Sequence, residues 1–518
     1  MNNAAELLKS LITYAIVVPV ALLVGYLLTN PLTVSTFFFV GAVAFVLIFP
    51  VLARWHYPIL LFSWSAVCIF FFVKGMPNVG QIMIVISLGL SIVEHIMNPQ
   101  RHFIRVPSVT VPLLALVIVV VITAKMTGGI GMHALGSDIY GGRKYMYLFL
   151  GIAGYFALTS RAIPPEKARL YAGLYFLGGV TTLIGDLYPY APRWSYMLFH
   201  FFPPSAGAIT GVSTGDLELG TSRLGGIGNC AVVLFLWFLA RYGLRGIFLE
   251  GKLWRPVLLA VFGCLIMLGG YRTSVFLAGL AFVFMFFAER LHRTQMLGVF
   301  ILGGTLGVAL LLPLADKLPF TFQRSLAFLP LHLDPVAKQS AEGSTEWRIA
   351  MWEALLPQIP QHLLLGKGFA ISPEDYDEMM GGQTSFRSID ASAQPLALSG
   401  DYHNGMISVV LSFGIWGVVV MLWFMFAGLR VVYLNMRYGR PELYTINAML
   451  FLLYFNEMGS YLCCLGGLGV SSDMVFFVGP LGMSIALNHG VCRPAPKPVA
   501  PVETVGSRRL VPPIPAYQ

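Results

Sequence analysis

Apolar runs of about 20 residues recur along the whole chain, and they constrain its fold more than any other feature. A run of this length can cross a lipid bilayer as a helix, whereas an open sheet would leave backbone polar groups unpaired there. The 518 residues are 57% hydrophobic and only 11% charged, against about 25% charged residues in soluble domains. The sequence therefore predicts an all-α integral membrane protein.

About fourteen such runs can be counted, which predicts roughly 12–14 transmembrane helices. The expected spans are 9–28, 32–52, 58–73, 79–97, 109–126, 144–160, 168–188, 225–243, 255–270, 272–289, 296–315, 404–428, 443–465 and 471–488. The expected domains are a transmembrane bundle over 1–315, a large and partly helical loop over 316–403, further transmembrane helices over 404–490 and a disordered tail over 491–518.

The basic residues indicate how the chain is oriented. With the N-terminus in the cytoplasm, the N-terminal segment, the inner loops and the tail together hold 20 of the 33 Lys and Arg residues, as the positive-inside rule expects. The net charge of +9 is then explained mostly by topology, and no nucleic acid partner is expected. In this orientation the long loop faces outward and the C-terminal tail faces the cytoplasm.

Several cations lie on the outer side, against this trend. Arg143, Lys144, Arg223 and Arg272 each stand at the outer end of a predicted span, and Arg348 lies in the loop. One such residue can simply reach the membrane interface with its long side chain. Several of them on one side of the membrane favour binding of an anionic ligand there.

Two motifs place an outer arginine among glycines and hydroxyls. They are Thr221-Ser222-Arg223-Leu224-Gly225-Gly226 and Gly269-Gly270-Tyr271-Arg272-Thr273-Ser274. Glycine lets a ligand approach the backbone, and a guanidinium suits phosphate oxygens. A helix is expected to run inward from the first motif, so we expect its N-terminal dipole to add to Arg223. The alternative for the second motif is an ordinary turn between two helices.

The loop is predicted to contain a short amphipathic helix over 344–352, with Ser344 as its N-cap and Glu346 in its first turn. Arg348 and Trp352 are spaced four residues apart and share one face of this helix. A neighbouring apolar ridge is formed by Trp347, Met351 and Leu355. Such a helix can lie on the bilayer surface or cover a cavity as a lid.

The loop ends in Asp401-Tyr402-His403-Asn404, where the chain enters the next apolar span. A histidine here can act as a general base near neutral pH, tuned by Asp401 or another carboxylate. The alternative is a hydrogen-bonded histidine at the membrane interface. Glu457 lies inside a later span, so it should face the bundle interior, either paired with an outer arginine or in a direct role.

Other chemistries find no support in the sequence. There is no P-loop for a nucleotide, no nucleophile elbow and no metal-ligand spacing among the six cysteines and ten histidines. We therefore expect neither a metal nor another cofactor.

In these motifs the chain resembles the O-antigen ligase and O-antigen polymerase family of bacterial envelope proteins. The resemblance covers about 205–428, and the first 200 residues match only as an array of helices. It rests on the ordered succession of Ser222–Gly226, Tyr271–Ser274, Glu346–Arg348 with Trp352, Gly366–Phe369, and His403–Asn404 followed by Gly414–Gly417. One departure is the Gly-Tyr before Arg272, where relatives often have Ser or Gly.

The resemblance implies a GT-C-like, metal-independent and inverting glycosyltransferase of the bacterial inner membrane, with its site facing the periplasm. The donor would be a glycan on undecaprenyl diphosphate, and the acceptor lipid A-core or a similar lipid. Arg223 and Arg272 would hold the diphosphate, and His403 would take the acceptor proton. Further substrate-binding residues would be Arg348, Arg143, Lys144, Trp352, Asn404 and Tyr271, supported by Glu457 and Asp401.

Two alternatives stay open beside the ligase, which we favour slightly. A polymerase would transfer the glycan to another repeat unit, and the motifs do not separate the two activities. A transporter of polyprenyl-diphosphate glycans would use the outer arginines to bind a passing diphosphate. Such a transporter should show internal repeats and polar residues near the membrane midplane in both halves, and the sequence shows neither.

Overall fold

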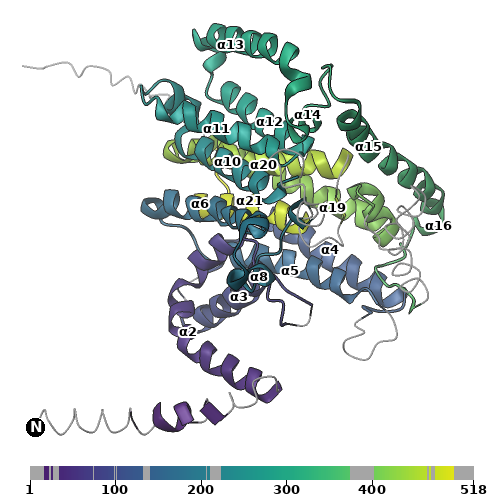
Figure 1. Cartoon of the computed structure of the whole chain (residues 1–518). Helices are drawn as coiled ribbons and strands as arrows, with labels where there is room; N and C mark the ends of the chain where they lie inside the picture. The colour runs from purple at the N-terminus through teal and green to yellow at the C-terminus, as the bar shows by residue number, and fades with distance from the viewer. Residues whose placement is uncertain are drawn as a thin grey trace, which may run out of the picture.

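The computed structural model describes residues 14, 17–22, 25–26, 34–73, 75–98, 100, 102–131, 140–205, 207–209, 223–373, 402–463, 466–467 and 473–494. Within these ranges the only regular secondary structure is helical. Two isolated β-bridges pair Ile69 with Asn78 and Tyr140 with Ile371. Figure 1 shows the helices gathered into one bundle, with α2 reaching away from it. The predicted all-α class is confirmed.

The described α-helices are α2 (Val34–Ser63), α3 (Val79–Met97), α4 (Pro107–Met126), α5 (Gly142–Leu158), α6 (Ala168–Leu177), α7 (Thr182–Asp186), α8 (Leu198–Phe201), α10 (Gly225–Phe248), α11 (Trp254–Leu268), α12 (Arg272–Ala288), α13 (Met296–Leu311), α14 (Phe320–Ser325), α15 (Pro335–Leu355), α16 (Ile359–His362), α19 (Gly405–Tyr438), α20 (Tyr444–Cys463) and α21 (Asp473–Asn488). Short 3₁₀ segments join some of them: η2 (Pro165–Lys167), η3 (Gly178–Thr181), η4 (Tyr188–Tyr190), η5 (Arg193–Ser195), η6 (Leu291–Arg293), η7 (Leu312–Lys317), η8 (Leu356–Gln358) and η9 (Pro441–Leu443).

Five helices among the described residues are long and apolar enough to cross a membrane: α3, α4, α10, α13 extended by η7, and α19. Four further apolar helices are shorter, namely Leu47–Ser63 within α2, α11, α12 and α21. Their bounds lie within a few residues of most predicted spans from 79 onward, although α19 extends ten residues further, to Tyr438. The chain is thus a multi-pass membrane protein, while its total number of spans stays a prediction.

The predicted division between the spans 32–52 and 58–73 is wrong. Helix α2 runs through it, with Pro50 and Pro58 inside. Proline bends a helix without necessarily ending it, and the purple α2 changes direction in Figure 1. Residues 64–73 are not helical, although they are apolar. Ser65 Oγ donates to Tyr175 O at 2.7 Å, so neighbouring helices bind this irregular segment, as a membrane interior requires.

The predicted span 168–188 is not one helix either. It divides into α6, the 3₁₀ segment η3 and the short α7. A Cβ atom on Gly178, at the start of η3, would lie only 1.9 Å from Phe62 O of α2. The chain therefore changes helix type where it packs directly on the backbone of α2, a contact that periodicity does not reveal.

The core of the bundle is formed by α5, α10, α19, α20 and α21. Every residue from Phe477 to Leu487 of α21 is buried. In contrast, α13 buries none of its residues and lies at the rim of the bundle in Figure 1. Its apolar surface is therefore expected to face lipid.

The bundle has two ends that differ in charge. We call the end where α10, α12 and α19 begin the site end, and the end where α12 and α19 finish the distal end. Most arginines of the described chain lie at the distal end, including those within 241–255, 290–293 and 430–440. The positive-inside rule predicts that this end faces the cytoplasm.

Helix α19 is interrupted near the site end by Gly414. This residue has a φ of 64° and a ψ of −162°, a backbone conformation that strongly favours glycine. A Cβ atom here would lie 2.7 Å from Leu364 O and 2.8 Å from Leu363 O. The break separates Gly405–Phe413 from the rest of the helix, and the loop packs directly against it.

The break leaves helix carbonyls without their usual partners, and the Gly-Lys-Gly turn of the loop supplies new ones. Lys367 N donates to Leu411 O at 2.8 Å, and Gly368 N donates to Ser412 O at 2.9 Å. Backbone groups at membrane depth must be satisfied within the protein. The middle of the loop is therefore hydrogen-bonded into the bundle rather than lying free on its surface.

We predict that Gly414→Val destabilises the protein. Valine is strained at this φ, at a cost of about 1–3 kcal/mol, and its Cβ would press on two loop carbonyls. The matched control is Gly279→Ala in α12, where an added Cβ meets no atom within 4 Å. Thermal unfolding of the two purified variants in detergent measures the difference. Equal unfolding temperatures for Gly414→Val and the wild type would show that the break does not need glycine.

Candidate active site

The two glycine-flanked arginine motifs meet at the site end. Leu224 N, just before α10, donates to Leu268 O at 3.2 Å, which joins the start of α10 to the end of α11. A Cβ on Gly270 would lie 3.3 Å from Arg223 Cγ, so the stem of Arg223 runs along the turn that precedes α12. Gly270 has a φ of 66°, which that turn requires. Arg223 and Arg272 are thus carried by adjoining segments.

Arg223 is half-buried and lies near the phenol of Tyr271. Burial lowers the pKa of its guanidinium, and the charge interaction with Tyr271 opposes this shift. The group stays protonated at neutral pH, because arginine does not lose its proton in proteins. A poorly solvated cation at this position favours an anion beside it. Tyr271 itself is exposed, and its ring packs near Gly225.

Arg272, the first residue of α12, reaches across to the loop helix α15. Its Nη2 donates to Ala341 O at 2.9 Å and lies 3.3 Å from Thr345 Oγ1. Both acceptors are neutral. Among the described residues neither Arg223 nor Arg272 forms an ion pair, so their positive charges are not cancelled by a carboxylate.

The first turn of α10 already holds a carboxylate. Asp186, at the end of α7, is buried, and its Oδ2 accepts a hydrogen bond from Ile227 N at 2.8 Å. Thr182 Oγ1 donates to Gly226 O at 2.9 Å beside it. Asp186 thus already binds one of the first-turn amides of α10 and places a carboxylate there, so the expected contribution of the α10 dipole to ligand binding beside Arg223 stays a prediction. Thr221 and Ser222 of this motif lie outside the described residues.

The loop helix is longer than predicted. Instead of starting at Ser344, α15 begins at Pro335, with Asp334 as its N-cap. Asp334 Oδ1 accepts a hydrogen bond from Val336 N at 2.7 Å. An Asp-Pro pair is a strong start signal, because the carboxylate caps the helix and proline suits its first position. Ser344 lies in the middle of the helix.

The predicted apolar ridge of α15 packs on the start of α19. Met351 and Leu355 are buried in one cluster with Tyr402 and Leu411. The cluster joins the loop helix to the segment that carries His403. An apolar contact of this kind keeps water out of the region beneath the helix.

Two tryptophans of α15 contact His403 or the residue before it. Trp352 Nε1 donates to Tyr402 O at 2.9 Å, and the ring of Trp347 lies 5.3 Å from the His403 ring. His403 has a φ of 44°, unusual for a residue other than glycine, so its backbone is held in place by these neighbours. Trp352 therefore positions the histidine segment.

Asn404 caps α19. Its Oδ1 accepts a hydrogen bond from Ile407 N at 3.1 Å. Its predicted role in substrate binding would have to use the amide nitrogen Nδ2 of the side chain, because Oδ1 caps the helix. Asp401, which was expected to tune His403, lies outside the described residues.

His403 opens into a cavity of about 360 Å³ between α12, α20 and α21. Thr273 and Ser274, next to Arg272, line one side of it. Glu457 of α20 and Asp473 of α21 also line this cavity. Ser460 adds a third hydroxyl, so a histidine, two carboxyl groups and three hydroxyls line one space, which suits binding and deprotonation of a hydroxyl compound.

Glu457 does not pair with an outer arginine, as one interpretation of the sequence expected. Among the described residues it forms no ion pair, and it shares the cavity with Asp473. Asp473 accepts a hydrogen bond from Gly467 N. Asp473 was not among the predicted site residues, although a charged residue in the first turn of an apolar helix is a signal for such a role.

Arg348 lies on α15 one turn before Trp352 and is half-buried. Arg143 Nε donates to Tyr147 Oη, and its guanidinium carbon lies 5.2 Å from that ring. Lys144 Nζ lies 5.7 Å from the ring of Phe369. None of these three cations lines the His403 cavity, so their predicted roles in substrate binding stay predictions.

The segment Tyr140–Tyr145, which carries Arg143 and Lys144, docks the loop. Tyr140 and Ile371 exchange two backbone hydrogen bonds of 3.0 Å each. Phe369 N donates to Tyr145 Oη at 2.9 Å. A Cβ on Gly141 would lie 2.0 Å from Phe369 O, so this glycine allows the loop to touch the start of α5. This segment holds Phe369 and Ile371, which directly follow the Gly-Lys-Gly turn, against the start of α5.

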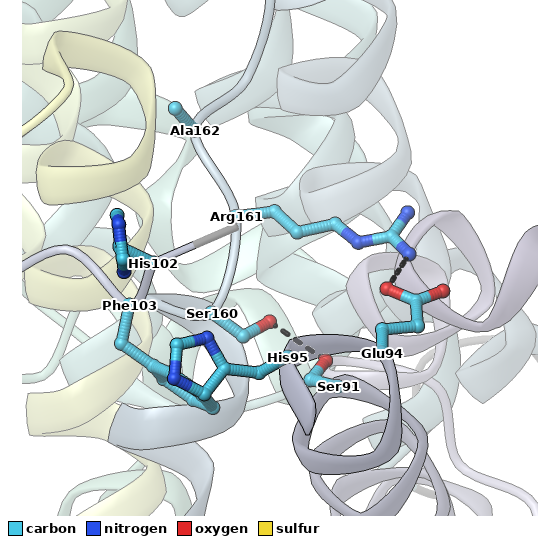
Figure 2. A pocket seen from close by; sticks show the side chains of 8 residues that line it. All are labelled: Ser91, Glu94, His95, His102, Phe103, Ser160, Arg161 and Ala162. Atoms are coloured by element: carbon cyan, nitrogen blue, oxygen red, sulfur yellow. Dashed lines mark hydrogen bonds and ion pairs between the residues drawn. The ribbon is translucent and has the colours of Figure 1, made fainter. Parts of the chain in front are cut away.

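A second cavity, of about 280 Å³, lies at the distal end between α3 and the segment after α5. Figure 2 shows Arg161 turned toward Glu94, with which it forms an ion pair. The rings of His95 and His102 lie 5.7 Å apart on another side. Here the arginine is neutralised by its partner, in contrast to Arg223 and Arg272. This cavity is separate from the candidate active site.

No group of three or more His, Cys, Asp or Glu side chains in the described part of the chain is arranged to hold a metal ion. The candidate site therefore consists of cations, hydroxyls, carboxylates and one histidine.

Comparison with known proteins finds a family match over part of the chain. Residues 256–422 match the model of a family described as O-antigen ligase. The match contains Tyr271, Arg272, Arg348, His403 and the interrupted start of α19, and it confirms the resemblance inferred from the motifs. Arg223, Glu457 and Asp473 lie outside it. No curated protein matches the chain.

We predict that the loop can be cross-linked to the start of α5. A hydrogen-bonded antiparallel pair has Cα atoms about 5.5 Å apart, within the range of a disulfide. In a chain whose native cysteines are replaced by serine, Tyr140→Cys with Ile371→Cys should form a disulfide under mild oxidation. A protease site inserted at Gly251, where the backbone is open, makes the cross-link visible as two fragments that stay joined without reductant.

The controls are the two single-cysteine variants, which should release separate fragments. Separate fragments from the double variant, in protein that remains monodisperse, would contradict the docking of the loop on α5.

Proposed function

We propose that this chain, which carries an O-antigen ligase family segment over residues 256–422, transfers a glycan from undecaprenyl diphosphate to lipid A-core or a similar lipid. The reaction would take place at the periplasmic face of the bacterial inner membrane, without a metal ion or nucleotide. The observation that carries the proposal is the meeting of two arginines without carboxylate partners beside a cavity that contains His403.

A lipid diphosphate leaving group explains the arginines. As the bond between the sugar and the phosphate breaks, negative charge grows on the diphosphate. Guanidinium groups stabilise such charge through paired hydrogen bonds, and they act strongly where water is excluded. Removing one preorganised donor costs about 2.7–4 kcal/mol in the transition state. Arg223 and Arg272 are our choices for this task, with Arg348 next.

The proposed reaction is a single displacement. The acceptor oxygen attacks the anomeric carbon from the face opposite the diphosphate, a new carbon–oxygen bond forms, and the bond to the phosphate oxygen breaks. The hydroxyl proton passes to His403, and the undecaprenyl diphosphate leaves with the electron pair. Attack from the opposite face inverts the configuration at the anomeric carbon.

Two carboxyl groups line the cavity in which this proton transfer would take place. A negative charge on Asp473 would favour the protonated form of the imidazole, which is the form that His403 takes after the reaction. Glu457 and Asp473 line the same cavity and can also accept hydrogen bonds from the hydroxyls of the acceptor. Thr273 and Ser274 add neutral partners on the side nearest Arg272.

The orientation follows from the charges of the two ends. The distal end holds most of the arginines and is expected in the cytoplasm, so the site end faces the periplasm. ATP is absent from that compartment, and the energy of the donor bond drives the transfer. The loop over the site end would then exclude water from the reacting centre.

The direct test uses the purified chain with a defined undecaprenyl-diphosphate glycan and either a lipid or a glycan acceptor. The ligase predicts a product with the mass of lipid plus glycan. A product with the mass of two joined glycans would replace the ligase with a polymerase. Intact donor with every acceptor, together with donor movement across a vesicle membrane, would favour a transporter instead.

We predict that Arg223→Ala, Arg272→Ala and His403→Ala each lower the transfer rate by roughly a hundredfold or more, as the loss of a preorganised catalytic group does. Single-turnover rates at matched membrane levels measure this. Lys338→Ala on α15 is the control for loss of an exposed charge, and its surface pair with Glu342 is expected to matter little.

Arg272 also anchors α15, so its two roles must be separated. Thr345→Val removes the hydroxyl that Arg272 contacts and keeps the charge. The proposal expects near-normal transfer in Thr345→Val. A loss as large as that of Arg272→Ala would show that anchoring, rather than the diphosphate, explains the arginine.

We predict that Trp352→Phe lowers kcat by up to about tenfold and leaves KM for the donor nearly unchanged. Phenylalanine keeps the apolar contact and removes the hydrogen bond to Tyr402 O, which is worth about 0.5–1.5 kcal/mol. Because this bond holds the residue before His403, its loss should affect the proton acceptor more than donor binding. A large rise in KM with normal kcat would instead make Trp352 a substrate contact.

A further inference from the structure

A second group of arginines without carboxylate partners among the described residues lies at the distal end, far along the bundle from the His403 cavity. There a cavity of about 580 Å³ is formed between the start of α4, the distal half of α19 and the segment after α21. Its lining contains three arginines and a histidine: Arg105, Arg430, Arg493 and His489. No Asp or Glu is among the described residues that line it. The cavity is therefore strongly basic.

The protein itself does not use these three guanidinium groups. Within the described chain, Arg105, Arg430 and Arg493 form neither an ion pair nor a hydrogen bond. Nearby arginines at the same end behave differently, because Arg161 pairs with Glu94 and Arg255 pairs with Glu250. Three like charges around one cavity repel each other, so the arrangement favours a bound anion.

The start of α4 adds to the attraction for an anion. Pro107 and Ser108, the first residues of this 20-residue helix, line the cavity. The N-terminal end of a helix carries partial positive charge, and the N-cap residue Val106 supplies no side-chain hydrogen bond to it. The hydroxyl of Ser108 offers a further donor. This end of α4 is thus not filled by a carboxylate, unlike the start of α10.

The remaining walls of the cavity are apolar. Val431 and Leu434 of α19 and Val106 before α4 line it, and both helices are long enough to span the bilayer. A ligand that fits must therefore combine an anionic group with hydrocarbon chains that run along these helices. Basic pockets between transmembrane helices on the cytoplasmic side bind anionic lipid headgroups by this means.

We propose that this cavity binds the phosphate headgroup of an anionic phospholipid from the leaflet at the distal end. The arginines contact the phosphate oxygens, and the acyl chains lie against α4 and α19. The lipid would add to the contacts that join the start of α4, the distal part of α19 and the segment after α21, such as the hydrogen bond from Cys492 N to Asn435 Oδ1. The proposal is independent of the transfer reaction.

Native mass spectrometry of the full chain in detergent tests the proposal with two phospholipids that share the same acyl chains. Phosphatidylglycerol is anionic, and phosphatidylethanolamine is zwitterionic. The wild type should retain phosphatidylglycerol at least about tenfold better. Equal retention of the two lipids by the wild type would overturn the proposal without any variant.

The site is tested by Arg105→Ala/Arg430→Ala/Arg493→Ala, which should lose the preference for phosphatidylglycerol. The matched control is Arg293→Ala/Arg437→Ala/Arg440→Ala, which removes three exposed charges from the same end but none from the cavity lining. The control should keep the preference. Retention by the first variant, or equal loss by the control, would contradict a site at this cavity.

Inorganic phosphate distinguishes a lipid from a free anion. In lipid-free detergent, phosphatidylglycerol should raise the unfolding temperature of the wild type at concentrations where inorganic phosphate does not. The same rise with inorganic phosphate alone would show a site for a soluble anion and overturn the lipid assignment.

Discussion

The hydrogen bonds between the Gly-Lys-Gly turn and the interrupted start of α19 hold the candidate site together. Only glycine fits at residue 414, and its conformation frees the carbonyls of Leu411 and Ser412 for Lys367 and Gly368. Because unsatisfied carbonyls are costly at membrane depth, the loop and the helix break require each other. This joint fixes the first turns of α19, and with them the position of His403 over the cavity.

Charge pairing separates the parts of the molecule that build structure from those that can bind ligands. Arg161 and Arg255 each pair with a carboxylate. In the described part of the chain, two groups of arginines lack a carboxylate partner, Arg223 with Arg272 near the turn before α12 and the arginines around the cavity at the start of α4. Both groups suit phosphate chemistry, one at each end of the bundle. The His403 cavity differs from both, because its ionisable groups are two carboxylates and an imidazole.

Much of the fold could be predicted because apolar runs report burial in lipid or protein, and most helices from α3 onward follow them. The runs fail at 64–73 and 178–181, where the chain stays apolar but leaves the α-helix to pack on other backbones. The arginine motifs and His403 were found from residue type and order. The long-range contacts could not be predicted in this way. Asp186 accepts a hydrogen bond from α10, and Arg272 donates one to α15, between segments that are distant in the sequence. The start of α15 at Pro335 could have been predicted from the sequence, because Asp334 is a good N-cap and proline suits the first helical position.

The central claim is that Arg223 and Arg272 act together on one diphosphate. Single-turnover transfer rates of Arg223→Lys, Arg272→Lys and the double variant test it most directly. Effects of groups that act as a unit are not additive, so the double variant should lose clearly less than the product of the two single losses. A loss equal to that product, within about twofold, would mean that the two arginines act independently and would contradict the shared diphosphate site.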